Sequence, residues 1–181
     1  MSSLNAAGFW LIYHFAHRWF LLDAAGIFLA NYLPYLLGAG FLLLVFREKG
    51  WRRRFYRFAE GSLAIVLSRG LVTEVIRILY NHPRPFDALG FTPLIPESGP
   101  SFPSGHMTFF FALAMTVWYA NRKWGIWYFV LSAVIGVARI YVGVHWPFDI
   151  AGGIVIGVAC GAFIHWLLKD SREKLFGNAP F

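Results

Sequence analysis

Three short motifs contain the residues that could do chemistry in this chain. They are Arg77-x6-Arg84-Pro85, Pro103-Ser104-Gly105-His106 and Arg139-x5-His145-x3-Asp149. Together they supply three guanidiniums, two imidazoles and one carboxylate. A guanidinium binds phosphate oxygens in pairs, and an imidazole can serve as a nucleophile or as a proton donor. The motifs therefore predict that a phosphoryl group is removed from a substrate and passed through a histidine.

His145 is the predicted nucleophile, and Asp149 is the carboxylate predicted to orient it. The two residues lie four positions apart, and Pro147 between them suits the first turn of a helix. One helical turn would bring the carboxylate beside one ring nitrogen and leave the other nitrogen unprotonated. The alternative is a plain hydrogen bond between side chains four apart that stabilises the start of a helix. His106 is the predicted general acid, which protonates the leaving oxygen.

The predicted phosphate-binding residues are three arginines and a turn, namely Arg77, Arg84, Ser104, Gly105 and Arg139. An arginine in or beside a membrane helix is costly unless it is paired, reaches the lipid headgroups or has a function. Three of them beside two histidines favour a function. Helix-terminal N–H groups attract anions, and a glycine lets a phosphate approach the backbone. The alternative for the Ser104–Gly105 turn is an ordinary helix cap.

Apolar stretches of about 20 residues, each long enough to cross about 30 Å of hydrocarbon, must position these motifs. Hydrophobic residues make up 58% of the 181 residues. Because lipid offers the backbone no hydrogen-bond partners, the stretches are predicted to be helices. We expect an all-α fold, a polytopic bundle of transmembrane helices that forms one integral-membrane domain over residues 1–181. The five predicted spans lie near residues 21–46, 59–80, 104–121, 125–143 and 148–168.

Two polar features within the apolar stretches need an explanation. Residues 6–20 mix aromatic residues with two histidines and an arginine, which suits either a helix in the membrane interface or a short sixth span. Arg69 lies inside the second predicted span, at a depth similar to that of Asn31 and Ser132. Because a lone guanidinium in the membrane would be costly, we expect these three residues to form a structural polar cluster.

The positions of the basic residues behind the net charge of +7 indicate how the chain is oriented in the membrane. Basic residues crowd residues 47–58, 122–123 and 169–174, which alternating spans place on one side of the membrane. The positive-inside rule makes that side cytoplasmic, so all three motifs are expected at the opposite face. This distribution favours attraction to membrane lipids and argues against nucleic acid as a partner. No metal or other cofactor is expected, because two histidines and the single motif carboxylate of Asp149 would hold zinc or magnesium poorly.

The three motifs resemble those of the type 2 phosphatidic acid phosphatase superfamily, whose membrane-bound members share their site with vanadium haloperoxidases. The family pattern is Lys-x6-Arg-Pro, then Pro-Ser-Gly-His, then Ser-Arg-x5-His-x3-Asp. Here Arg77 replaces the lysine and keeps its charge, and Ala138 replaces the serine and removes one hydroxyl. The resemblance covers residues 77–149 by motif and most of the chain by the layout of its spans.

The resemblance implies a phosphatase that acts on an isoprenoid or glycerolipid phosphate through a phosphohistidine at His145. The small size and residues 32–37 and 100–102 look most like bacterial undecaprenyl-diphosphate phosphatases of the plasma membrane, with the site facing the periplasm or the cell exterior. The alternatives are phosphatidylglycerophosphate, phosphatidic acid and lipid A phosphatases. A protein that only binds or transports lipid phosphates is a further alternative, but it would need the arginines and not a nucleophile.

Overall fold

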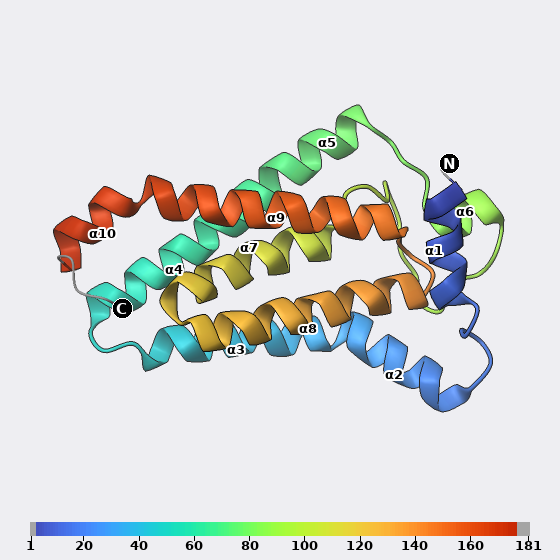
Figure 1. The fold of residues 1–181 in the computed structure, drawn as a ribbon, viewed down its shortest axis with the longest axis horizontal. Coiled ribbons are helices and arrows are strands. Elements are labelled where there is room, and N and C mark those ends of the chain that lie inside the picture. Colours follow the sequence, from blue (N-terminus) through green and yellow to red (C-terminus); the bar gives the residue numbers. More distant parts are fainter. Residues whose placement is uncertain (1–2, 177–181) are drawn as a thin grey trace.

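The structure is a computed structural model that describes residues 3–176, and within that range it contains helices and no β-strand (Figure 1). The predicted all-α class is therefore confirmed. In chain order the elements are α1 (Ser3–Tyr13), α2 (Phe20–Asn31), α3 (Leu33–Arg47), α4 (Trp51–Ile65), a π-helical stretch η1 (Val66–Val72), α5 (Thr73–Leu79), α6 (Pro85–Leu89), α7 (Gly105–Ala120), α8 (Arg122–Tyr141), α9 (Pro147–Leu167) and α10 (Lys169–Phe176).

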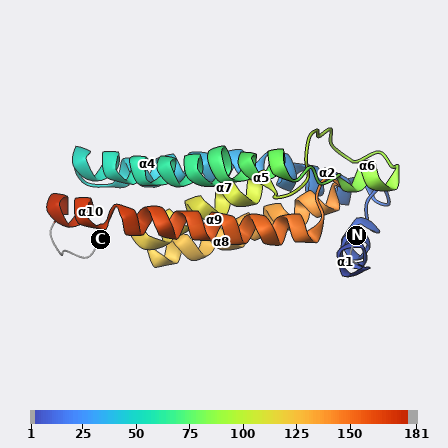
Figure 2. The ribbon, with the colours of Figure 1, turned by 90° about the horizontal axis from the view of Figure 1, so that it is seen from above.

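Helix α7 runs through the middle of the bundle. It contacts α8 and α9 on one side and α3 and α4 on the other, and Figure 2 shows α4 and α5 in a separate layer from α8 and α9. Gly153, Gly157 and Gly161 allow α9 to approach α7 closely, because a Cβ at each would lie 2.6–2.8 Å from the nearest atom of Met107, Phe111 or Met115. Small residues four apart are typical of close helix contacts in membranes.

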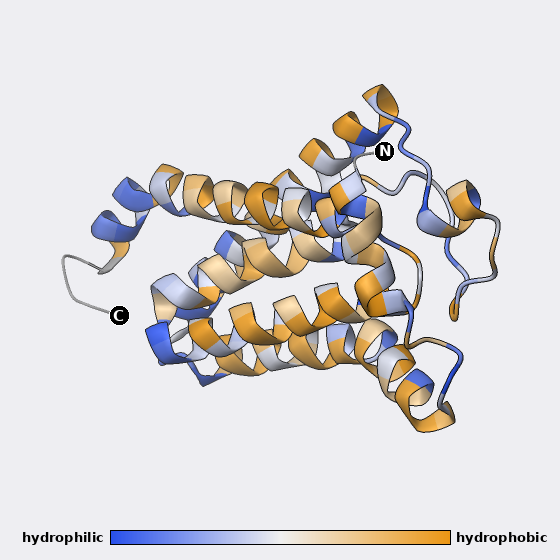
Figure 3. Cartoon of the chain, turned by 45° about the vertical axis from the view of Figure 1, so that its right-hand side comes forward, coloured by the Kyte–Doolittle hydropathy of each residue, from blue (hydrophilic) through white to orange (hydrophobic). Residues whose placement is uncertain are grey.

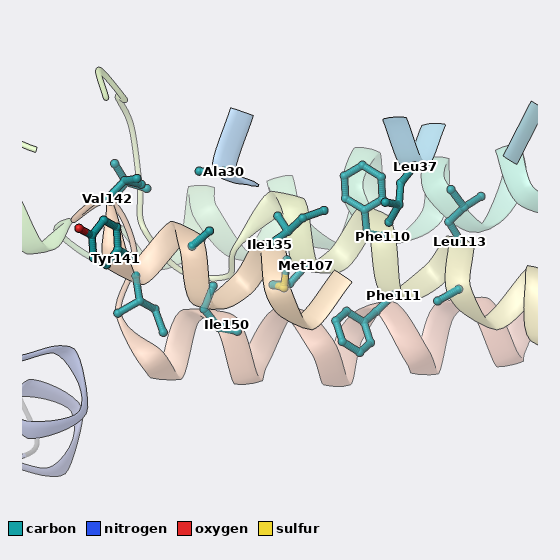
Figure 4. Packing of buried hydrophobic residues seen from close by; sticks show 14 of the residues in the cluster. Ala30, Leu37, Met107, Phe110, Phe111, Leu113, Ile135, Tyr141, Val142 and Ile150 are labelled. Carbon is teal, nitrogen blue, oxygen red and sulfur yellow. The ribbon is translucent and has the colours of Figure 1, made fainter. Parts of the chain in front are cut away.

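The core of the protein forms around α7. Figure 4 shows Phe110 pointing toward Leu37 of α3 and Phe111 pointing toward α9, so α7 packs on both sides. Met107 and Ile135 fill the space between α7 and α8 and are fully buried. Figure 3 shows apolar residues along the long flanks of the bundle and polar residues gathered toward its ends, as expected for helices that lie in lipid.

Each of the five predicted spans corresponds to helical structure, with some different boundaries. The stretch 21–46 is the pair α2 and α3, bent by 40° at a break next to Tyr32, and the stretch 59–80 is the end of a helix that already begins at Trp51. Within residues 3–176, α8 and α9 are each long and apolar enough to cross a membrane, and the bent pair brings the number to three. The count of five spans stays a prediction.

Helix α1 lies across one end of the bundle and not along it (Figures 1 and 2). Its 11 residues extend about 16 Å, roughly half the hydrocarbon thickness. The buried ring of Phe9 contacts the rings of Phe91 and Trp146, with centroids 5.9 and 5.1 Å apart, and the Asn5 side chain accepts a hydrogen bond from Phe148 N. Of the two alternatives for residues 6–20, the structure favours the interfacial helix.

Candidate active site

A cavity of about 1010 Å³ brings residues of all three motifs together at the end of the bundle that α1 crosses. Six of the predicted site residues line it, namely Arg77, Arg84, Gly105, His106, Arg139 and His145. Ser104 and Asp149 are buried directly beside these residues in the chain and in space. The structure thus places these residues together at one end of the bundle. The order of the predicted spans had placed them at the same face of the membrane.

His145 lies in the turn between α8 and α9 and is 1% exposed. Its Nδ1 atom is 3.4 Å from Asp149 Oδ2, so the other ring nitrogen, Nε2, remains for the cavity. Asp149 Oδ2 also accepts a hydrogen bond of 2.7 Å from the backbone N–H of Trp146 at the start of α9. Asp149 therefore caps the helix and faces the histidine at once, and the two sequence alternatives for this pair coexist.

Burial makes His145 a neutral imidazole. It lowers the pKa of His145 to about 4, while the hydrogen bond with Asp149 acts in the opposite direction and the Arg139 charge acts in the same direction as burial. At neutral pH the ring therefore carries one proton, and a proton on Nδ1, next to the carboxylate, leaves Nε2 with a free lone pair. That is the state a nucleophile requires.

Ser101 belongs to this site, although no motif assigned it a role there. Its hydroxyl donates to Asp149 Oδ2 and lies 3.4 Å from His145 Nδ1. Its backbone N–H donates to His82 O at 2.8 Å, and His82 Nδ1 in turn lies 3.7 Å from Asp149 Oδ1. The sequence signals for Ser101 were its place two residues before the Pro103 motif and the resemblance carried by residues 100–102, neither of which indicated a contact with Asp149. The Ser101 hydroxyl thus holds the carboxylate that faces His145, and His82 lies near the other carboxylate oxygen without a hydrogen bond to it.

Glu97 is the second residue that the motifs did not indicate. Its carboxylate forms an ion pair with Arg139, and its Oε1 atom lies 3.8 Å from Arg84 Nη2. Burial raises the pKa of Glu97, but the charges of Arg139 and Arg84 outweigh burial and hold it below its usual value. This corner of the cavity therefore stabilises an anion. The available sequence signal was that Glu97 is the only acid in residues 88–104.

Arg84, the residue before α6, is anchored by the loop that follows α6 and by the turn between α8 and α9. It donates hydrogen bonds to the backbone oxygens of Gly99, Val144 and Ser98, at 2.8, 2.9 and 3.1 Å. Burial lowers the pKa of Arg84 to about 10, so the guanidinium keeps its positive charge at neutral pH. A guanidinium held in this way does not have to be ordered again when an anion binds.

The Pro103 motif forms the start of α7. Gly105 is the first residue of the helix and His106 the second, and Arg77 Nη2 donates to Pro103 O at 3.1 Å. The hydroxyl of Ser104 is buried, makes no capping bond and has no hydrogen-bond partner within residues 3–176. The alternative of an ordinary serine cap is therefore not supported.

The expected cluster of Arg69, Asn31 and Ser132 was wrong as a structural network. Arg69 pairs with Glu74, and the buried Ser132 hydroxyl has no hydrogen-bond partner in the described part of the chain. Arg69 and Asn31 both line the cavity that contains the motif residues. The partner of Arg69 is thus an acid five residues away on the same helix. Glu74 can contact Arg69 at this spacing because the stretch Val66–Val72 is π-helical.

The cavity combines a charged end with an apolar wall. The charged end holds the arginines and His145, and the apolar wall comes from α3 and α7 through Pro34, Gly38, Ala39, Leu42, Phe109 and Phe110. If a phosphate is bound at the arginines, a hydrocarbon chain attached to it can lie along the apolar wall. This combination suits a phosphorylated lipid.

The fold and the site are those expected of a membrane-bound phosphatase, and the comparisons with known proteins show the family. The model of the PAP2 superfamily matches residues 61–173, more than half of the chain, so this protein belongs to the PAP2 superfamily. The chain is thus an integral-membrane protein and a phosphatase of the lipid phosphatase family.

Two relatives and one solved structure are similar over most of the chain. A Bacillus licheniformis protein named bacitracin transport permease protein BcrC is 29% identical over 91% of this chain and 81% of its own length. The undecaprenyl-diphosphatase BcrC of Bacillus subtilis is 30% identical over 92% of this chain and 85% of its own length. The crystal structure of Aquifex aeolicus LpxE is 29% identical, covers 90% of this chain and 95% of its own, and superposes with a TM-score of 0.75.

Proposed function

We propose that this protein hydrolyses undecaprenyl diphosphate to undecaprenyl phosphate and inorganic phosphate. The observation that carries the proposal is the buried His145–Asp149 pair, which faces a cavity with arginines at one end and apolar side chains along the other. The similarity to the undecaprenyl-diphosphatase of Bacillus subtilis supports an isoprenoid diphosphate as the substrate. A site that only binds phosphate needs the arginines, but it does not need a neutral histidine held by a carboxylate.

In the proposed reaction, Nε2 of His145 attacks the terminal phosphorus of the substrate. The N–P bond forms while the bond from phosphorus to the bridging oxygen breaks, and His106 protonates that oxygen as the lipid phosphate leaves. Water then attacks the phosphorus of the phosphohistidine: a P–O bond forms, the N–P bond breaks and returns its electron pair to Nε2, His106 takes back a proton from the water, and inorganic phosphate is released. Asp149 stabilises the positive charge that develops on the ring. None of these steps requires a metal ion.

The transition state is proposed to be stabilised by positive charge and by backbone N–H groups. The groups concerned are Arg77, Arg84, Arg139, Ser104 and Gly105. In phosphoryl transfer, positioning and electrostatic stabilisation supply most of the catalysis. In the structure the Glu97 carboxylate forms ion pairs with Arg84 and Arg139. The substrate phosphate would replace this carboxylate between the two guanidiniums.

We place the site at the extracytoplasmic face of the bacterial plasma membrane. The basic segments 47–58, 122–123 and 169–174 support this orientation. They lie between α3 and the first turns of α4, between α7 and α8, and on α10, which are all at the end of the bundle opposite α1 (Figure 1). A substrate that presents its diphosphate at the outer leaflet would then reach the cavity without crossing the membrane.

The test is phosphate release from undecaprenyl diphosphate, phosphatidylglycerophosphate and phosphatidic acid in the presence of EDTA. His145→Ala should lower the rate by on the order of 10³-fold or more, whereas the matched change at the exposed His14 should leave it unchanged. Fast release from the diphosphate that depends on His145 supports the proposal. Release from a glycerolipid alone would keep the chemistry and overturn the substrate.

Binding or transport of lipid phosphates without hydrolysis is the second candidate function. The name of the Bacillus licheniformis relative favours it, and the arginine-lined cavity would serve it equally well. Vanadate separates the two, because it mimics pentacoordinate phosphorus and should inhibit an enzyme of this kind. No phosphate release from any of the three lipids, together with transport that vanadate does not inhibit, would favour the second candidate.

A further inference from the structure

Two arginine–glutamate clusters line the cavity. The first contains Arg84, Arg139 and Glu97, and its charges act directly on His145. The second contains Arg69 and Arg77 with Glu74, whose Oε1 atom contacts Arg69 and lies 3.9 Å from Arg77 Nη1. Arg69 belongs to none of the three motifs, and the mechanism proposed above gives it no task.

The helix geometry places Arg69 and Arg77 on one face. Eight residues of regular α-helix would set them about 80° apart around the axis. The stretch Val66–Val72 is π-helical, so its turns are wider and each residue rotates less, which reduces that angle. Both side chains consequently reach the same cavity. A π-helical stretch inside an α-helix often marks a functional site.

The irregular stretch is held by specific side-chain contacts. The hydroxyl of Thr73 donates to Ser68 O at 2.8 Å, five residues back, and lies 3.1 Å from the hydroxyl of Thr108 on α7. Thr73 and Ser68 are both fully buried. The π-helical turn is thereby fixed against α7, and Arg69 is presented to the start of that helix.

Arg69 lies against the backbone that immediately precedes the predicted general acid. A Cβ on Gly105 would be 2.6 Å from Arg69 Nε and 3.1 Å from its Cδ, so the glycine makes room for this side chain. Arg77 binds Pro103 O two residues earlier. Arg69 thus borders the start of α7, next to His106, whereas Arg139 and Glu97 of the first cluster lie close enough to act on His106 and Arg139 also acts on His145.

The geometry of an in-line displacement gives the position of Arg69 beside His106 a meaning. The nucleophile and the leaving oxygen lie on opposite sides of the phosphorus that is transferred. With His145 as nucleophile and His106 as acid, the leaving group occupies the His106 side. In a monoester that group is an uncharged alkyl oxygen. In a diphosphate it is a second phosphate, which needs its own positive partner.

We propose that Arg69 binds the lipid-linked phosphate of a diphosphate substrate, the phosphate that stays on the lipid after hydrolysis. This inference rests on the proposed function and names the residue that gives the site its preference for a diphosphate. Glu74 holds Arg69 in place until the substrate binds, and with 47% of its side chain exposed it can turn away when the phosphate arrives. Arg69 is itself 38% exposed, on the cavity side.

The test compares farnesyl diphosphate with farnesyl phosphate, two probes with the same hydrocarbon chain. Arg69→Ala should lower kcat/KM for the diphosphate about 10- to 100-fold, mainly through KM, because a charge-assisted contact to one phosphate is lost. The same variant should lower kcat/KM for the monophosphate less than about threefold. Arg69→Lys should restore part of the loss on the diphosphate, since the charge returns without the fork.

Arg52→Ala is the matched control, because Arg52 is exposed at the opposite end of the bundle. It should change neither substrate. A second readout is inhibition by inorganic pyrophosphate against inorganic phosphate, and Arg69→Ala should weaken the first selectively. An equal loss on both farnesyl substrates would mean that Arg69 only supports the Gly105 turn, and it would overturn the inference. If Arg69→Ala fails to fold, the Arg69→Lys comparison decides in the same way.

The proposed function and the role of Arg69 can be wrong independently. If the wild-type protein hydrolyses farnesyl phosphate but not the diphosphate, the proposed function is wrong and the inference falls with it. If the wild-type protein hydrolyses the diphosphate and the Arg69 variants show no selectivity, the proposed function stands and the role of Arg69 is wrong.

Discussion

Replacing Asp149 with asparagine tests whether the carboxylate determines which nitrogen of His145 can attack. Asp149 is 1% exposed and receives hydrogen bonds from Trp146 N and the Ser101 hydroxyl while it faces His145 Nδ1. Asparagine has nearly the same shape, so the cavity should keep its walls. It carries two donors where the carboxylate had only acceptors.

The effect on activity follows from the tautomer. If the introduced amide nitrogen takes the position of Oδ2 and donates to Nδ1 of His145, then Nδ1 must accept, the proton moves to Nε2, and Nε2 has no lone pair for phosphorus. The Trp146 N–H, which donates to Oδ2 in the native protein, then loses its acceptor. A wrong tautomer in a comparable histidine–carboxylate pair costs about 10⁴ in kcat. We expect Asp149→Asn to lower kcat by roughly 10³- to 10⁴-fold with little change in KM. Loss of a charge-assisted hydrogen bond should also cost about 1.5–3 kcal/mol of stability.

The assay is steady-state phosphate release in detergent, with thermal unfolding measured on the same samples. Asp170→Asn is the matched control, because Asp170 is exposed on α10, at the end of the bundle remote from the site. A folded Asp149→Asn protein that keeps more than about a tenth of the wild-type kcat would refute the reasoning, since Asp149 would then act only as a cap of α9.

Two further predictions concern pH and helix packing. Burial lowers the pKa of His145 to about 4, so the imidazole keeps its lone pair as the pH falls to about 5. The part of the kcat/KM profile due to His145 should therefore decline only near pH 4. A decline centred near the ordinary histidine pKa of about 6.5 would contradict a buried nucleophile. Gly157→Ala should lower the thermal midpoint by an amount equivalent to about 1–3 kcal/mol, because its Cβ would lie 2.8 Å from Thr108 O and from Phe111 Cβ. Gly38→Ala, where a Cβ meets nothing within 4 Å, should not lower it.

The sequence alone was enough for features that depend on short stretches of chain. Apolar length predicts helices because lipid cannot satisfy the backbone, and all five predicted spans are helical in the structure. The His145–Asp149 contact also needs little more than a spacing of four residues and a proline that starts a helix. The chemistry expected of the motifs could be stated at this level because it depends on residue type.

The tertiary structure decided the contacts between distant segments. Ser101 reaches Asp149 across 48 positions, and Glu97 reaches Arg139 across 42; a single serine or glutamate in a loop carries no local pattern that indicates such a partner. The contacts of Arg69 could not be predicted either, because regular α-helix would set it about 80° from Arg77, and the π-helical stretch that reduces this angle is fixed by a contact of Thr73 with Thr108 on another helix. Local spacing determines which helices form and which neighbours can meet on them, whereas the packing of η1 against α7 and α9, and the contacts of the loop before α7, determine which side chains share the cavity.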